Sequence, residues 1–238
     1  MALLTTVEHE HALAERAATG LVAAVHEAVR AAGTARISLA GGTTPKAMYE
    51  LLATAPGRPP IPWERVHLYW SDERHVPPDH KDSNYGMARD ALVMHVPIPA
   101  SQVHRIRGER PPDEAARLYE RELPDRFDVL LLGLGEDAHI ASIFPRSLVL
   151  QETKHRVAAP WVAHLKAYRI TLTPPALLSA ARIMMIVSGA AKAPAVAAAF
   201  EKPADAASYP VHLLRPAGDR VEWFIDRAAA RDLSSPHA

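Results

Sequence analysis

The sequence predicts an α/β fold in which helices flank a largely parallel central sheet. Short apolar runs typical of buried strands alternate along the chain with segments of helical periodicity. Three of these apolar runs lead straight into glycine-containing turns, as strands do at the carboxyl edge of a parallel sheet. Because the 238 residues show no internal repeat and no convincing linker, we expect one Rossmann-like layered domain over residues 1–238.

Composition and charge exclude several classes of protein. Hydrophobic residues make up 48% of the chain and charged residues 23%, which is enough for a sizeable core and unlike a disordered protein. The 27 Lys and Arg residues equal the 27 Asp and Glu residues, so the basic excess of a general nucleic-acid binder is missing. The absence of cysteine excludes disulfides, thiolate nucleophiles and cysteine-bound metals.

The amino-terminal region resembles neither a signal peptide nor a membrane span. Only a short apolar start precedes Glu8, His9 and Glu10, which does not suit a signal peptide. No run in the chain approaches the roughly 18 apolar residues of a membrane span. We therefore expect a cytoplasmic protein with no membrane or nucleic-acid partner and no obligatory protein partner.

The first half of the chain predicts two helices around one strand. Residues 8–32 carry apolar residues at four-residue steps, and Gly33 follows as a helix stop. A short strand is expected over 36–40 and a helix from 46 to 53. Residues 54–62 are rich in proline and read as a connector to the next strand, over 66–70.

The turn after the predicted strand 36–40 has the composition of an anion-binding site. Gly41 and Gly42 let backbone N–H groups approach a phosphate at a helix N-terminus. Thr43 and Thr44 add hydroxyl groups, and Pro45 suits the first helical turn. The alternative is an ordinary strand-to-helix turn with Thr44 as N-cap. The turn is not a Walker loop, because the Gly-Lys-Ser/Thr ending is missing.

The predicted strand 66–70 opens into a polar loop over 71–86. Arg74 in this loop has the fork of donors that binds a phosphate bidentately. The alternative is that this loop is only a solvated surface segment. Its position straight after an apolar strand favours a contribution to the site. The side chains of His75, Asp79 and His80 do not have the spacing of a standard metal site. Ser83 is expected to cap a helix over 84–96.

The middle of the chain contains the segment around which we expect the site to form. A short strand over 103–106 and a helix over 111–123 lead to residues 128–145, where an apolar run at 129–132 ends in Gly133 and Gly135. Asp137 and His139 follow at once. A neutral imidazole can deprotonate water, and a carboxylate can orient it. Without a cysteine or a G-x-S-x-G elbow, direct attack by water is favoured over a covalent intermediate.

The same segment has two other interpretations. Residues 133–138 fit the loose dinucleotide fingerprint G-x-G-x-x-G/A, but Glu136 and Asp137 would repel a diphosphate and Pro145 would cut the following helix short. A lone histidine beside a polar turn is more often structural, although the glycines and carboxylates around His139 weaken that reading.

The last third of the chain predicts further strands and a second anion-binding turn. Strands are expected over 156–162, 168–172, 182–187 and 221–225, with a short helix from Thr173 and a polar tail from Arg227. The strand 182–187 leads through a glycine turn to Lys192 and then to a helix over 193–200. Lys192 can balance a phosphate there, or it is an exposed surface lysine.

Four segments together resemble the family of glucosamine-6-phosphate isomerases and 6-phosphogluconolactonases. They read SLAGGTTP at 38–45, WSDERHVPPDHKDSNYG at 70–86, LLLGLGEDAHIASIFP at 130–145 and VSGAAKAPAV at 187–196. The central segment departs from the family pattern, since Ala138 replaces a glycine and Ile140 a threonine. If position 138 needs a positive φ, the alanine there carries strain of roughly 1 kcal/mol.

The resemblance implies roles for the candidate residues. His139 would be the general base that activates water against a lactone carbonyl, with Asp137 supporting it. The 6-phosphate of a sugar-phosphate lactone would be bound by Gly41, Gly42, Thr43, Arg74 and Lys192. The implied reaction is hydrolysis of 6-phospho-D-glucono-1,5-lactone in the pentose phosphate pathway, with no metal and no cofactor.

The sequence leaves two alternatives to lactone hydrolysis. In the deaminating isomerases of the family we expect Asp-Glu-Tyr where this chain has residues 72–74 as Asp-Glu-Arg. We also expect Asn-Glu-Pro where residues 142–145 read Ser-Ile-Phe-Pro. The second alternative is a non-enzymatic sugar-phosphate sensor, against which the chain shows no attached DNA-binding helix pair.

Overall fold

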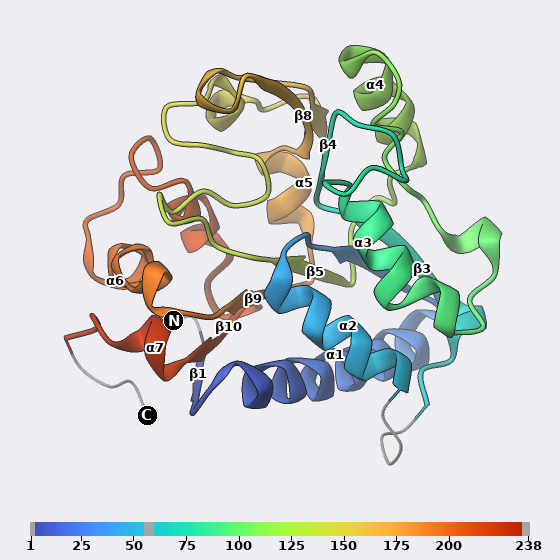
Figure 1. Cartoon of the computed structure of the whole chain (residues 1–238), viewed down its shortest axis with the longest axis horizontal. Coiled ribbons are helices and arrows are strands. Elements are labelled where there is room, and N and C mark those ends of the chain that lie inside the picture. The colour runs from blue at the N-terminus through green and yellow to red at the C-terminus, as the bar shows by residue number, and fades with distance from the viewer. Residues whose placement is uncertain (1–2, 55–59, 235–238) are drawn as a thin grey trace.

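The computed structural model describes residues 3–54 and 60–234, and these confirm an α/β fold with a parallel central sheet (Figure 1). Six strands form the large sheet in the order β1-β10-β9-β5-β2-β3, and every neighbouring pair is parallel. Their bounds are β1 Leu3–Val7, β2 Ala35–Leu39, β3 Val66–Trp70, β5 Val129–Leu132, β9 Arg182–Val187 and β10 Val221–Asp226. Strand β5 is buried at every position, as a strand covered on both faces must be.

The strand order reverses between β2 and β5. From β2 the chain moves to β3 on one side, whereas β5, β9 and β10 follow one another on the other side. The loops that leave the carboxyl ends of β2 and β5 therefore diverge and leave a crevice, which is where open parallel sheets bind ligands. The two glycine turns singled out in the sequence, at 41–42 and 133–135, are these loops.

A small antiparallel sheet stands at the carboxyl end of β3. It consists of β4 Asp72–Arg74, β6 Val157–Ala158, β7 Trp161–Val162 and β8 Ala167–Leu172, with β8 pairing all three of the others. Only Ser71 separates β3 from β4, so the small sheet is tied directly to the edge of the large one. Figure 1 shows β4 and β8 near α4, on the side of the molecule opposite α1.

Helices cover the large sheet. Their bounds are α1 Glu10–Ala32, α2 Thr43–Thr54, α3 Asn84–Ala91, α4 Pro112–Glu122, α5 Pro174–Ser179, α6 Ala193–Glu201 and α7 Arg227–Ala230. Short 3-10 segments occupy Trp63–Arg65, Val93–His95, Ala100–Gln102, Leu148–Gln151, Ala163–Leu165, Ala190–Lys192 and Pro210–Arg220. Helix α1 begins at an N-cap, His9, whose Nδ1 accepts from Ala12 N at 3.2 Å, and it ends at Gly33 with φ 77°.

Two buried tyrosines fix the points where the chain leaves the sheet. The Tyr49 hydroxyl accepts from Ala40 N at 3.0 Å and donates to Ala40 O at 2.9 Å. The Tyr119 hydroxyl does the same for Trp70, at 2.7 and 2.8 Å. Burial raises the pKa of both phenols, so they stay neutral and keep both roles. The residues directly before Gly41 and Ser71 are thereby held in place.

Several predicted element boundaries were wrong. Strand β1 was missed, since its LLTTV sequence gives no sustained apolar run, and β4 was expected to be loop. The helix expected to continue to 96 ends at Ala91, because Leu92 has φ −138°. The expected strand 103–106 is only an isolated bridge from Val103 to Leu68. The expected strand 156–162 is two short strands, with Pro160, which has no N–H to donate, between them.

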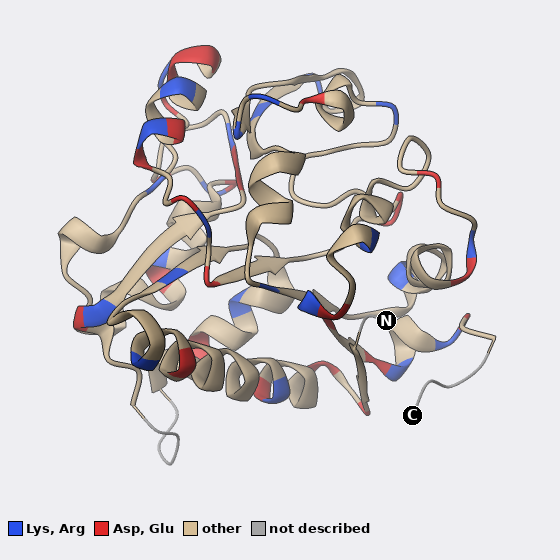
Figure 2. Cartoon of the chain, turned by 180° about the vertical axis from the view of Figure 1, so that it is seen from behind, with Lys and Arg blue, Asp and Glu red and all other residues tan. Residues whose placement is uncertain are grey.

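The alternative interpretation of the first glycine turn placed Thr44 at the N-cap of the following helix. Helix α2 begins at Thr43, so Thr44 lies inside the helix and is not its N-cap. Most of the proline-rich connector and the last four residues of the polar tail lie outside the described residues. Figure 2 shows basic and acidic residues interspersed along α1 and α4, in line with the zero formal net charge. Of the helices in the described residues, none is long and apolar enough to cross a membrane.

Candidate active site

A pocket of about 680 Å³ lies at the crevice between the diverging loops. Residues from the carboxyl ends of four parallel strands and from the small sheet line it. The lining includes six of the seven residues singled out in the sequence, namely Gly41, Gly42, Arg74, Asp137, His139 and Lys192. Thr43 lies exposed in the first turn of α2 and does not line the pocket.

Asp137 and His139 form a hydrogen-bonded pair on the turn after β5. His139 Nδ1 donates to Asp137 Oδ1 at 2.6 Å, and His139 N donates to the same oxygen at 3.2 Å. Burial alone would raise the pKa of Asp137, but the hydrogen bonds and charge of His139 outweigh it and lower that pKa. An ionised carboxylate on Nδ1 fixes the tautomer that leaves Nε2 free to accept a proton.

The turn that carries this pair is built from residues in the left-handed region. Ala138 has φ 62°, Ala141 φ 48° and Arg146 φ 61°, and these are three of the four non-glycine residues with positive φ in the described parts of the chain. The expectation for Ala138 is therefore confirmed. Each such residue costs of order 1–2 kcal/mol, and strain of this kind gathers at functional sites. Ile140 is fully buried, so the side chain at this position joins the core.

We expect Ala138→Val to destabilise the protein by about 2–4 kcal/mol, because a β-branched residue is disfavoured at positive φ and this buried site leaves it no room. Urea unfolding would measure the change in the free energy of unfolding. The matched substitution Ala163→Val, at an exposed position, should change it by less than about 0.5 kcal/mol. A cost below about 1 kcal/mol at position 138 would show that the turn relaxes to a different conformation.

Two glycines allow the active groups to lie close to the backbone. A Cβ at Gly135 would be 1.9 Å from His139 Nδ1 and 2.6 Å from Asp137 Oδ1. A Cβ at Gly41 would be 2.0 Å from Asn84 Oδ1. These distances are far below van der Waals contact, so the imidazole and the Asn84 amide each occupy the space of a missing side chain.

A buried polar network forms one wall of the pocket. Asn84 Nδ2 donates to Asp72 O at 3.0 Å and to Asp72 Oδ1 at 3.1 Å, and Ser142 Oγ donates to Asp72 Oδ2 at 2.5 Å. Thr171 Oγ1 accepts from Ser142 N at 3.1 Å. Asp72, Asn84 and Ser142 are each at most 9% exposed. The network connects the loops after β3 and β5 to the small sheet.

Two arginines on neighbouring antiparallel strands line the pocket. Arg74 on β4 is the register partner of Arg169 on β8, and both line the pocket. Among the described residues, no carboxylate lies within ion-pair distance of either guanidinium; Arg74 Nη1 donates to Asp82 O and Arg169 Nη1 to Tyr168 O at 3.2 Å. Burial and the charge of Arg74 lower the pKa of Arg169. Like charges directly opposite one another destabilise a sheet, and an anion bound between the two guanidinium groups would turn this repulsion into attraction.

Lys192 enters from the turn after β9. It is half-buried in the 3-10 segment that precedes α6, and within the described ranges it makes no ion pair. The alternative of a simple surface lysine does not account for its place in the pocket wall. With Arg74 and Arg169, it gives the pocket three cationic side chains, and the Asp137–His139 pair lines the same cavity.

Sequence reasoning missed Arg169 and His164 as pocket residues. Arg169 lies in the predicted strand 168–172 without any glycine or polar cluster beside it, and only its charge in a mostly apolar strand marked it. His164 lies in the turn between β7 and β8, where its ring packs edge-on against Phe144 at 5.0 Å between centroids. No sequence signal distinguishes it from other exposed histidines of the chain.

The structure does not support dinucleotide binding by residues 133–138, because no helix follows their glycine turn in the described residues. That motif needs a helix N-terminus directly after the glycine turn to receive a pyrophosphate. Between β5 and the 3-10 segment at Leu148 the described chain has only turns and an isolated bridge from Ile140 to Ile143.

The fold and the pocket define an α/β protein that presents a hydrogen-bonded Asp–His pair and a cationic cluster at the switch point of a parallel sheet. Residues 8–223 match the family model described as glucosamine-6-phosphate isomerases/6-phosphogluconolactonase. The chain belongs to this family, as the resemblance of its four segments predicts.

Named relatives and solved structures support the same placement. A 6-phosphogluconolactonase of Nostoc sp. is 37% identical over 94% of this chain and 95% of its own length. One of Mycobacterium tuberculosis is 39% identical over 90% of this chain and 92% of its own. The structure of 6-phosphogluconolactonase from Trypanosoma brucei has a TM-score of 0.86 at 27% identity, covering 98% of this chain and 99% of that one.

Proposed function

We propose that this protein hydrolyses 6-phospho-D-glucono-1,5-lactone to 6-phospho-D-gluconate, the second step of the oxidative pentose phosphate pathway. Relatives that carry the 6-phosphogluconolactonase name match it over nearly their whole length. The observation that carries the proposal is the arrangement of the pocket, where the Asp137–His139 pair shares one cavity with a cross-strand pair of arginines. A base and an anion site in one cavity suit an ester whose remote end is a phosphate.

His139 is the general base in this proposal. Its Nε2 takes a proton from water while the water oxygen forms a bond to the lactone carbonyl carbon. The carbonyl oxygen becomes an oxyanion, and its collapse breaks the bond between the carbonyl carbon and the ring oxygen. The proton held on His139 passes to the departing ring oxygen, which gives a hydroxyl and a carboxylic acid. Asp137 stabilises the imidazolium that exists between these two transfers.

Arg74, Arg169 and Lys192 bind the phosphate, together with backbone N–H groups of Gly41 and Gly42. The phosphate lies far from the scissile ester, so its binding energy positions the ring for attack without touching the reacting atoms. Thr43 does not line the pocket, so in this proposal it contributes the N-terminus of α2 next to the Gly42 turn and no direct contact to the phosphate.

The test compares two reactions of the family in the purified protein. We expect freshly generated 6-phosphogluconolactone to disappear faster than by spontaneous hydrolysis, with no ammonia released from glucosamine 6-phosphate. Ammonia release without lactone hydrolysis would assign the chain to the deaminating branch. That branch shares the fold, since a monomeric glucosamine-6-phosphate deaminase superposes with a TM-score of 0.85. Ligand binding without turnover in either assay would favour the sugar-phosphate sensor.

Arg74→Ala should raise KM for the phosphorylated lactone about 10- to 100-fold and leave kcat within about threefold, because a charge-assisted bond to phosphate contributes about 1.5–3 kcal/mol. Steady-state kinetics give both constants. The control Arg30→Ala removes an exposed arginine of α1 and should change neither. An unchanged KM in Arg74→Ala would remove this residue from the phosphate site.

A further inference from the structure

We propose that two buried carboxylates outside the pocket, Glu73 and Asp226, are positioning residues that hold the phosphate-binding cations in place. Glu73 fixes the loop that carries Arg74, and Asp226 fixes the turn that carries Lys192. The inference rests on the proposed function, in which these two cations bind the substrate phosphate. Neither carboxylate lines the pocket, so neither reaches the ligand itself.

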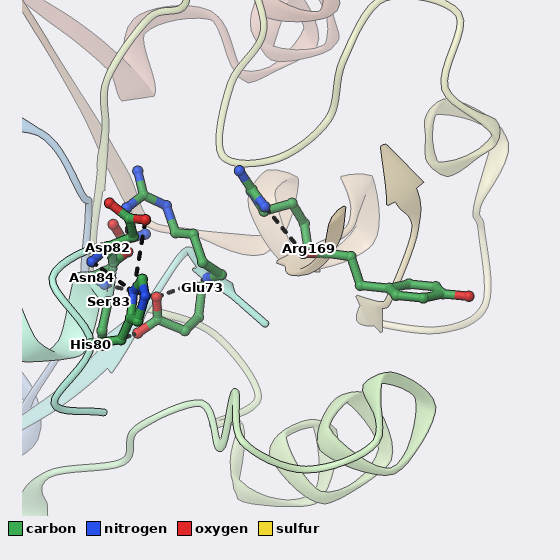
Figure 3. A network of polar contacts seen from close by, with 8 residues as sticks. Glu73, His80, Asp82, Ser83, Asn84 and Arg169 are labelled. Atoms are coloured by element: carbon green, nitrogen blue, oxygen red, sulfur yellow. Dashed lines mark hydrogen bonds and ion pairs between the residues drawn. The ribbon is translucent and has the colours of Figure 1, made fainter. Parts of the chain in front are cut away.

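Glu73 has a complete set of donors around a buried carboxylate. It is 1% exposed, and Oε1 accepts from Arg74 N at 2.8 Å and Asn84 N at 2.7 Å. Oε2 accepts from Ser83 Oγ at 3.0 Å and Tyr85 N at 2.8 Å. Figure 3 shows this carboxylate beside Ser83 and Asn84, with Asp82 and His80 on the adjoining loop.

These bonds close the loop between Arg74 and Asn84 at both ends. The backbone of Arg74 is tied to one end of the loop through Glu73, and its guanidinium donates to Asp82 O near the other. Asn84, held by the same carboxylate, fills the space beside Gly41 and donates to Asp72. Glu73 thus sets the position of a phosphate-binding arginine relative to a phosphate-binding glycine turn.

The chemistry of the site requires a carboxylate. Burial is the largest influence on Glu73 and raises its pKa, against four hydrogen bonds that lower it. All four partners donate, so a glutamine at this position would direct its amide N–H toward another N–H or hydroxyl donor. Asn84 N and Tyr85 N are the first N–H groups of α3, so Glu73 caps this helix together with Ser83, which accepts from Gly86 N at 2.9 Å. The bond from Arg74 N lies outside the cap and ties the arginine backbone to the helix terminus.

Asp226 holds the second cation by the same means. It is 4% exposed at the carboxyl end of β10, and it accepts from Ser188 Oγ at 2.5 Å, Gly189 N at 3.1 Å and Ala229 N at 2.8 Å. Gly189, at φ 96°, accepts from Lys192 N at 3.0 Å. The carboxylate, the glycine and the lysine backbone form one chain of hydrogen bonds that sets where Lys192 enters the pocket.

The experiment compares Glu73→Gln and Asp226→Asn on a lactone with a phosphate and on glucono-1,5-lactone, which has none. We expect KM for the phosphorylated lactone to rise about 10- to 100-fold in each variant, because a misplaced cation loses a charge-assisted bond to the phosphate. The kcat/KM for glucono-1,5-lactone should stay within about twofold, because that substrate has no phosphate to misplace.

Asp128→Asn is the matched control. Asp128 accepts from Arg36 N at 2.8 Å, and it precedes β5 at the edge of the sheet opposite the pocket. Loss of this structural carboxylate should lower the thermal midpoint without changing the preference for the phosphorylated lactone. Equal losses on both lactones in Glu73→Gln and Asp226→Asn would overturn the proposal and make these residues general supports of the fold.

Two further measurements keep the proposal open to refutation. If a carboxylate variant fails to fold, Ser83→Ala removes one hydrogen-bond donor to Glu73, and Ser188→Ala removes one donor to Asp226. An unchanged KM for the phosphorylated lactone in these serine variants would contradict the positioning role. Calorimetric binding of 6-phosphogluconate separates the two claims, since it needs no turnover. A wild-type protein that binds this ligand without hydrolysing the lactone contradicts the proposed function, whereas unweakened binding in Glu73→Gln and Asp226→Asn contradicts the positioning role.

Discussion

Replacing His139 by alanine is expected to lower kcat for lactone hydrolysis about 10²- to 10⁴-fold, the usual contribution of a positioned general base. The reason is the geometry of the turn after β5, where Asp137 holds Nδ1 at 2.6 Å and leaves Nε2 as the available base. In the proposed function other loops bind the phosphate, so the dissociation constant for 6-phosphogluconate should change by less than about threefold. Single-turnover rates and calorimetry measure the two quantities separately.

His155→Ala is the matched control for this variant. His155 is also paired with a carboxylate, with Nδ1 3.4 Å from Glu120 Oε2, but it is exposed and does not line the pocket. Its removal should leave kcat within about twofold of wild type. A large rise in the dissociation constant of His139→Ala with little loss of kcat would make His139 a ligand contact and remove it as the base.

Much of the fold could be predicted because burial marks the central strands. Strands β5 and β9 are covered on both faces, so their apolar runs stand out in the sequence. In a parallel sheet the carboxyl ends of all strands lie at one edge, which is why polar turns far apart in the sequence predict one site. This argument marked the turns of Gly41, Arg74, Asp137 and Lys192 one by one, the family resemblance grouped the four residues, and all four line the pocket.

The antiparallel part of the site depends on contacts that no local pattern reveals. Arg169 meets Arg74 only because β4 pairs with β8 in one register, across nearly a hundred residues of chain. Strand β1 was missed for a related reason. It pairs with β10 from the opposite end of the chain, and Thr5 and Thr6 interrupt its apolar pattern. Such elements are specified by tertiary partners and not by their own periodicity.

Gly135→Ala should be nearly as harmful as removal of the histidine, although it adds only one methyl group. The new Cβ would lie 1.9 Å from His139 Nδ1 and 2.6 Å from Asp137 Oδ1, so the imidazole must leave its position against the backbone. A displacement of about 1 Å in a catalytic group costs on the order of 10²-fold in rate, and we expect at least that loss in kcat. Steady-state kinetics measure it, and urea unfolding should show a loss of about 1–3 kcal/mol from overpacking.

Gly133→Ala separates this effect from a general intolerance of the turn. A Cβ at Gly133 would meet no atom within 4 Å, and the residue does not have a positive φ. It therefore should retain kcat within about twofold of wild type. Equal losses in the two variants would show that the turn rejects any side chain for backbone reasons. A loss confined to Gly135→Ala would show that the position of the imidazole against the turn is what the reaction requires.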